Sequence, residues 1–248
     1  MEKYSLNEGL IYPVIEIVYP YVDKNYKWKI NKTIDVTDHA MLVEVSDNYI
    51  LKFLPFAINS HDNILKEMQL HHASAALGIA PEIVSAWFSK NGGIIVMKKL
   101  GKDIGSLLTE YESLAVNQLI LSNIISIIGK LHLHQIAHGD LHFGNILTVA
   151  EGNKSVAVES HPFLPVIGPD KDNRDVELAD YLKKGYRYYL IDFGEARKLS
   201  GNISEDLPSI KKDYFHFGGG LYDLLNDFYS PSLRNIYETF LIITKQFE

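Results

Sequence analysis

Two short stretches of the chain carry side chains that could do chemistry together. The first, His138-Gly139-Asp140-Leu141-His142-Phe143-Gly144-Asn145, places an aspartate five residues before an asparagine, and the second, Ile191-Asp192-Phe193-Gly194, adds another aspartate. Two carboxylates and an amide oxygen can hold metal-bound phosphates and orient a hydroxyl toward them. The residue types and their order therefore predict a site for phosphate chemistry.

The elements around these stretches would hold them in place. An apolar run of β type adjoins each one, 145–149 after the first and 188–191 before the second. One long helix is predicted to end near Gln135 and to lead into the first stretch, because apolar residues recur at helical spacing: Leu119, Ile120, Ile124, Ile127, Ile128 and Leu131.

A lysine and a glutamate upstream form a second candidate pair. Lys52 lies in the apolar strand predicted over 49–53, and an ammonium group in that setting needs an anion. Glu67 is the only nearby glutamate on a predicted helix, which spans 64–70. The alternative is that Lys52 extends from an edge strand to solvent.

Taken together, these motifs resemble the protein-kinase-like superfamily over roughly residues 33–229. The resemblance implies an α+β, two-lobed protein-kinase-like fold. A small antiparallel β lobe with an aromatic N-terminal extension would occupy 1–97. A curtailed, mainly helical large lobe would occupy 98–248, with an insertion at about 150–186. The Leu100-Gly101-Lys102-Asp103 run is similar to hinges of the casein-kinase and vaccinia-related branches.

The same resemblance assigns roles to individual residues. Asp140 would align a substrate hydroxyl and accept its proton, Asn145 and Asp192 would bind Mg²⁺ or Mn²⁺, and Lys52, fixed by Glu67, would hold the phosphates of ATP. His138 would be the core histidine of the loop, and Asp213 would accept hydrogen bonds from the loop backbone. Further nucleotide contacts are implied at Val43, Ile50, Met97, Lys98, Leu100 and Leu147.

The chain departs from the family pattern at two points. No glycine occurs in Val36-Thr37-Asp38-His39-Ala40, where the family has a glycine-rich phosphate loop, so Thr37 and backbone amides would substitute or nucleotide binding would be weak. Gly139 replaces the arginine that clamps an activation-loop phosphate, which predicts an enzyme that needs no such phosphorylation.

Two further segments have no clear place in the family pattern. The insertion joins a Pro-rich half, 160–169, to a charged helical half, 175–184, and serves either as a solvated decoration or for docking of a substrate or partner. The aromatic residues of 1–30 predict an ordered, extended segment that packs on the small lobe or serves as a partner-binding arm. After the second stretch we expect a segment of about 18 residues, the helix that carries Asp213, and one last helix over 232–247.

Composition limits the remaining possibilities. A net charge of −7 gives no general attraction to nucleic acid, and the absence of cysteine excludes disulfides and thiolate sites. The loop histidines do not predict a metal site, since His132 and His134 face different ways on a helix. With neither a secretion signal nor a membrane span expected, the sequence predicts a cytoplasmic protein.

Three functions follow from the resemblance. The first is a compact serine/threonine protein kinase of viral or bacterial-effector type, which transfers the γ-phosphoryl group of ATP to a protein substrate. The second is a small-molecule phosphotransferase similar to aminoglycoside kinases, which share the His-Gly-Asp-Leu-His-x-Gly-Asn loop. The third is a pseudokinase that binds without catalysis, which the missing glycines favour.

Overall fold

The structure is a computed structural model that describes residues 30–37, 39–45, 48–152, 174–228 and 230–245. The aromatic N-terminal segment and the Pro-rich half of the insertion lie outside these residues. The chain divides into two compact units. We call Met1–His72 with Glu82–Lys99 the N-terminal unit, and Ala73–Pro81 with Leu100–Glu248 the C-terminal unit.

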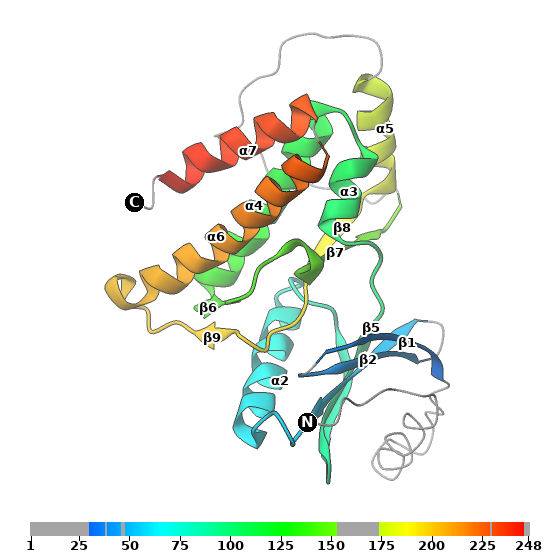
Figure 1. The fold of residues 1–248 in the computed structure, drawn as a ribbon, viewed down its shortest axis with the longest axis vertical. Coiled ribbons are helices and arrows are strands. Elements are labelled where there is room, and N and C mark those ends of the chain that lie inside the picture. Colours follow the sequence, from blue (N-terminus) through cyan, green and yellow to red (C-terminus); the bar gives the residue numbers. More distant parts are fainter. Residues whose placement is uncertain (1–29, 38, 46–47, 153–173, 229, 246–248) are drawn as a thin grey trace. The chain divides into compact units, whose positions relative to one another are not determined.

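The N-terminal unit contains a five-stranded antiparallel sheet in the order β1-β2-β3-β5-β4 (Figure 1). Its strands are β1 (Ile30–Val36), β2 (Met41–Val45), β3 (Tyr49–Pro55), β4 (Ile83–Ser89) and β5 (Gly92–Lys98). Alternating side chains give the sheet two apolar faces. One face packs around Val43, Leu51 and Val96, and the other packs Ile95 and Met97 against Ile64 of helix α2 (His61–Ala76).

The C-terminal unit is mostly helical. Its elements are α3 (Ile104–Glu110), α4 (Leu114–Leu133), β6 (Ile136–Ala137), the 3₁₀ turn η2 (Phe143–Asn145), β7 (Ile146–Ala150), α5 (Arg174–Lys184), β8 (Tyr186–Leu190), β9 (Arg197–Lys198), α6 (Ile203–Asp227) and α7 (Pro231–Thr244). Helix α7 packs against both α4 and α6 (Figure 1). An antiparallel sheet followed by a mostly helical part confirms the predicted α+β class.

Helix α4 is a core helix. Its length and an 18-residue window of mean hydropathy 1.5 would suit a membrane span, but Ile120, Ile124 and Ile128 are fully buried within the unit. Its polar residues are also engaged, since Asn117 Nδ2 donates to Ser232 Oγ of α7 at 2.7 Å. We therefore attribute its apolar character to packing inside the unit.

Helix α5, the charged half of the insertion, packs on its own unit. Strands β7 and β8 pair antiparallel across the insertion, and α5 lies against α4. Glu177 accepts a hydrogen bond from the Ser113 amide at 2.8 Å, and Lys184 Nζ lies 2.8 Å from Glu110. Tyr181 is buried and meets Tyr111 edge-on. These contacts argue against a purely solvated decoration in this half.

Helix α6 begins ten residues before Asp213. The segment between the Asp192 stretch and this helix is therefore shorter than the predicted length of about 18 residues. Asn202 caps the helix by accepting from the Ser204 amide at 3.1 Å, and its Nδ2 donates to Glu205 at 2.9 Å. Pro208 falls inside this helix, although proline removes a backbone hydrogen bond there. It lies near the start of a 25-residue helix, where the rest of the helix outweighs one lost hydrogen bond.

Candidate functional site

The loop 138–145 is tied to helix α6 by one buried carboxylate. Asp213 is fully buried and accepts hydrogen bonds from the His138 amide at 2.8 Å and the Gly139 amide at 2.6 Å. His132 of α4 places Nε2 2.8 Å from the same carboxylate. The predicted role of Asp213 as an acceptor for the loop backbone is confirmed. Charge-assisted bonds of this kind are among the stronger ones.

Gly139 is required by the shape of the loop. Its φ is +83°, a region that disfavours residues with a Cβ, and a Cβ at this position would lie 2.5 Å from the carbonyl oxygen of Glu195. An arginine would meet the same obstacle. The glycine is therefore a consequence of how closely the 195 segment approaches the loop, in addition to any difference in regulation.

His138 connects the loop to the turn at Asp192. Its ring Nε2 lies 2.9 Å from the Ile191 carbonyl oxygen, and its Nδ1 accepts from the Asp140 amide at 3.4 Å. Burial lowers the pKa of His138, and the nearby Asp213 only partly opposes this effect, so the neutral ring is favoured. The buried ring of Phe193 packs on it, with the ring centroids 5.0 Å apart. His138 thus has the core position predicted for it.

The register of β7 and β8 brings Asn145 next to the Asp192 turn. Ile146 pairs with Leu190, and the Ile191 amide donates to the Asn145 carbonyl oxygen at 3.0 Å. Asn145 Nδ2 donates to the Asp140 carbonyl oxygen at 2.9 Å, which leaves its side-chain oxygen as the acceptor end. Asp192 is exposed and has a φ of 62°, a strained value that often marks functional sites.

These donors fit a magnesium ion that is held partly by phosphate. Mg²⁺ keeps several waters and binds one or two protein oxygens plus substrate phosphates. Asn145 and Asp192 supply one amide oxygen and one carboxylate. Among the described residues no group of three or more histidine, aspartate or glutamate side chains could hold a metal ion by itself. Asn145 and Asp192 could thus hold Mg²⁺ together with oxygen ligands from water or a bound phosphate.

The Asp140 carboxylate lies beside two imidazoles. His142 Nε2 is 3.7 Å from Oδ2, and His216 Nδ1 of α6 is 3.4 Å from Oδ1. His142 Nδ1 accepts from the Gly144 amide at 3.1 Å, so in the neutral ring the proton sits on Nε2, toward Asp140. With 44% of its side-chain surface exposed, Asp140 remains open to solvent or to a substrate.

In the N-terminal unit, Lys52 and Glu67 form the predicted ion pair. Lys52 Nζ lies 2.7 Å from Glu67 Oε1, and each side chain exposes 6% of its surface. The pairing is confirmed, and the alternative of a lysine that reaches solvent is excluded by this burial.

The sheet register divides the predicted nucleotide contacts of this unit between two faces. Residues that face each other across antiparallel strands share a face, so Ile50 and Lys52 lie with Glu44 and Leu42. Val43 packs on the opposite face.

The four remaining predicted nucleotide contacts differ in how far they are buried. Met97 is buried beside α2, and Lys98 is exposed at the end of β5. In the C-terminal unit, Leu100 and Leu147 are partly buried. None of these four positions is tested as a nucleotide contact by the structure.

In the turn between β1 and β2, backbone amides form hydrogen bonds within the turn itself. The Thr37 hydroxyl accepts from the His39 amide at 3.2 Å and the Ala40 amide at 3.0 Å, and the Thr37 amide donates to the Ala40 carbonyl oxygen at 2.9 Å. Asp38 lies outside the described residues. Three amides that could have substituted for a glycine-rich loop are thus engaged within the turn.

Sequence reasoning missed two residues near the loop. His132 was considered only as a metal ligand, whereas it binds Asp213. His216 was not considered at all, and its place three residues after Asp213 on a helix was the available signal. The start of α6 had a clearer signal, the capping pattern Asn202-x-x-Glu205.

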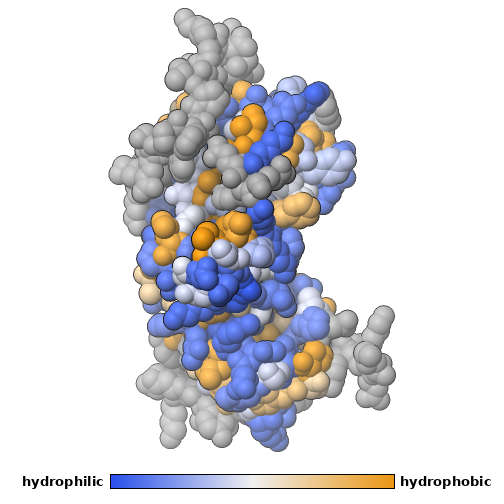
Figure 2. Space-filling model, turned by 90° about the vertical axis from the view of Figure 1, so that its left-hand side faces the viewer, coloured by the Kyte–Doolittle hydropathy of each residue, from blue (hydrophilic) through white to orange (hydrophobic). Residues whose placement is uncertain are grey.

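On the face of the molecule drawn in Figure 2, hydrophilic residues cover most of the described surface and apolar residues form small separate patches. Neither models of known protein families nor curated protein sequences yield a significant match to this chain.

Proposed function

We propose that the chain is an ATP-dependent protein kinase that transfers the γ-phosphoryl group to serine or threonine hydroxyls. The proposal includes the finer description of the fold as a two-lobed protein-kinase-like one with a curtailed large lobe. The observation that carries it is the loop 138–145: Asp213 holds its backbone, and Asn145 is linked to both Asp140 and the Asp192 segment. The buried pair of Lys52 and Glu67 supports it independently.

The proposed mechanism assigns each side chain one task. Asp140 aligns the substrate hydroxyl and accepts its proton as the new oxygen–phosphorus bond forms and the bond to the ADP leaving group breaks. Asn145 and Asp192 would hold the metal, and Lys52, oriented by Glu67, would bind phosphate oxygens. Bound Mg²⁺ would neutralise charge that develops on the phosphates. The expected location is the cytoplasm, with a protein as the substrate.

One observation favours a second candidate, the pseudokinase. The amides of Thr37, His39 and Ala40 bond within their own turn, so this turn offers little to a phosphate. Nucleotide affinity would then depend on Lys52 and the metal. The small-molecule phosphotransferase remains as an alternative only through the resemblance of the loop sequence.

Transfer of radiolabelled γ-phosphate from MgATP tests the proposal. The wild type is compared with Asp192→Asn and with a control, Asp62→Asn, whose side chain is 99% exposed on α2. We expect transfer to the protein itself or to casein by the wild type and the control, and at least a hundredfold loss in Asp192→Asn. Nucleotide binding by thermal shift without any transfer would favour the pseudokinase, and transfer only to a sugar or aminoglycoside panel would favour the small-molecule phosphotransferase.

A further inference from the structure

Three positions on one face of α6 contact successive parts of the loop 138–145. Asp213 binds the amides of His138 and Gly139, and His216 faces Asp140. A Cβ on Gly220 would lie 2.8 Å from the ring of Phe143. Spacings of three and four residues place these positions on one helical face. Helix α6 therefore holds the loop at its start, at Asp140 and near its end.

Of these three positions, His216 lies next to the side chain of Asp140. Its Nδ1 lies 3.4 Å from Asp140 Oδ1, and 31% of its side-chain surface is exposed. A carboxylate only accepts hydrogen bonds, so the neutral ring would carry its proton on Nδ1. The separation is slightly longer than a good hydrogen bond, and such contacts often shorten when substrate binds.

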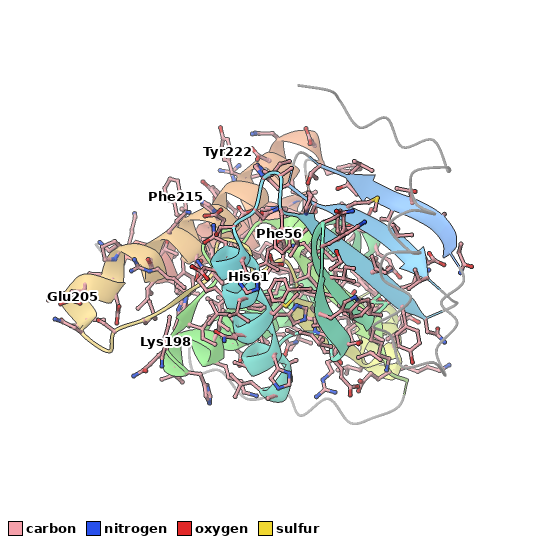
Figure 3. All side chains as sticks on the ribbon, turned by 90° about the horizontal axis from the view of Figure 1, so that it is seen from below. Phe56, His61, Lys198, Glu205, Phe215 and Tyr222 are labelled. Atoms are coloured by element: carbon pink, nitrogen blue, oxygen red, sulfur yellow. The ribbon has the colours of Figure 1, made fainter. Side chains whose placement is uncertain are left out.

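The neighbouring exposed residues on α6 do not share this contact. Phe215 exposes 81% and Tyr222 51% of their surface, and both extend away from the helix (Figure 3). Phe215 adjoins His216 in sequence and therefore gives a control that changes α6 at nearly the same place. This contrast separates an effect on Asp140 from a general effect on the helix.

We propose that His216 is a positioning residue for Asp140, an inference that rests on the proposed kinase function. By donating from Nδ1 to Oδ1, His216 fixes the orientation of the carboxylate so that a remaining lone pair accepts the substrate hydroxyl proton. His142 is positioned to assist at Oδ2, 3.7 Å away. The hydroxyl proton moves to Asp140, and His216 keeps its own proton throughout.

The kinetic test compares His216→Ala, His216→Asn and Phe215→Ala in the full chain, with MgATP and casein as substrates. An asparagine amide can donate from near the position of Nδ1. We expect kcat to fall roughly 10- to 100-fold in His216→Ala, as for other residues that orient a reactive group. The KM for ATP should change less than twofold, and His216→Asn should recover most of kcat. A His216→Ala variant with the kcat of Phe215→Ala would overturn the inference while the kinase function stands.

A spectroscopic test does not need phosphate transfer. Long-range ¹H–¹⁵N spectra of the imidazole rings identify the protonated nitrogen of His216 in the neutral ring. We expect the Nδ1–H form in the wild type and the Nε2–H form, favoured in water, in Asp140→Ala. An Nε2–H form in the wild type would contradict the proposed contact. If the wild type transfers no more phosphate than Asp140→Ala, the proposed function itself fails, and the positioning role fails with it.

Discussion

Replacing Gly139 with alanine should destabilise the protein through two separate effects. A left-handed backbone costs a residue with a Cβ about 1–2 kcal/mol. The new Cβ would also lie 2.5 Å from the Glu195 carbonyl oxygen, so the loop must move. That movement lengthens the 2.6 Å hydrogen bond from the Gly139 amide to Asp213. A bond to a charged group contributes about 1.5–3 kcal/mol, so we expect a total loss of about 2.5–5 kcal/mol.

The measurement is urea unfolding followed by far-UV circular dichroism, with Gly129→Ala as the control. Gly129 lies inside α4, and a Cβ there would meet no atom within 4 Å. The control should therefore gain about 0.5–1 kcal/mol from its better helix propensity. The same substitution is thus predicted to act with opposite signs at the two positions. A Gly139→Ala variant within about 1 kcal/mol of the wild type would refute the reasoning, because the backbone effect alone predicts more.

Three further predictions concern other parts of the site. Lys52→Met removes the ion-pair partner of Glu67, 2.7 Å away, and should cost about 3–5 kcal/mol of stability. In thermal melts, Lys52→Met combined with Glu67→Leu should recover most of that loss. Equal losses in the single and double variants would contradict this prediction. Folding lowers the pKa of His138, so the contribution of its neutral ring to stability is present in full above the unfolded pKa of about 6.5. That contribution declines as the pH falls toward the folded pKa. Stability should therefore fall between pH 7 and 5, and His138→Gln should flatten that slope; an unchanged slope would count against a buried neutral ring. Phosphate transfer should persist within about threefold when Ser200, Ser204 and Ser209 are replaced together by alanine. A loss above tenfold, or about 1.4 kcal/mol, would instead indicate a required phosphorylation.

The parts of the fold that the sequence predicted are those with a local physical signal. Helical spacing located α4 to within a few residues, and apolar runs located β3, β7 and β8 equally closely. The partner of Lys52 could be predicted because a buried ammonium group needs an anion and only Glu67 lay on the right helix. The role of Asp213 came from the resemblance, and its two backbone hydrogen bonds agree with it.

The parts that it could not predict depend on register between distant segments. The resemblance implied nucleotide contacts at both Val43 and Ile50, but strand register places the two residues on opposite faces of the sheet. His216 lies 76 residues after Asp140, and no local pattern connects them. The first part of α6 was also not predicted, although Asn202 caps the helix and the helix continues through Pro208.

The position of Asp213 also affects when the loop can form during synthesis. Its hydrogen bonds span 81, 75 and 74 residues of sequence, to His132, His138 and Gly139. A nascent chain emerges from its N-terminal end, so it presents both loop stretches well before the carboxylate that orders them. Until residue 213 leaves the ribosome, the amides of 138 and 139 lack their acceptor. The N-terminal unit can fold early, but the loop that would do chemistry is completed only when most of the chain has been made.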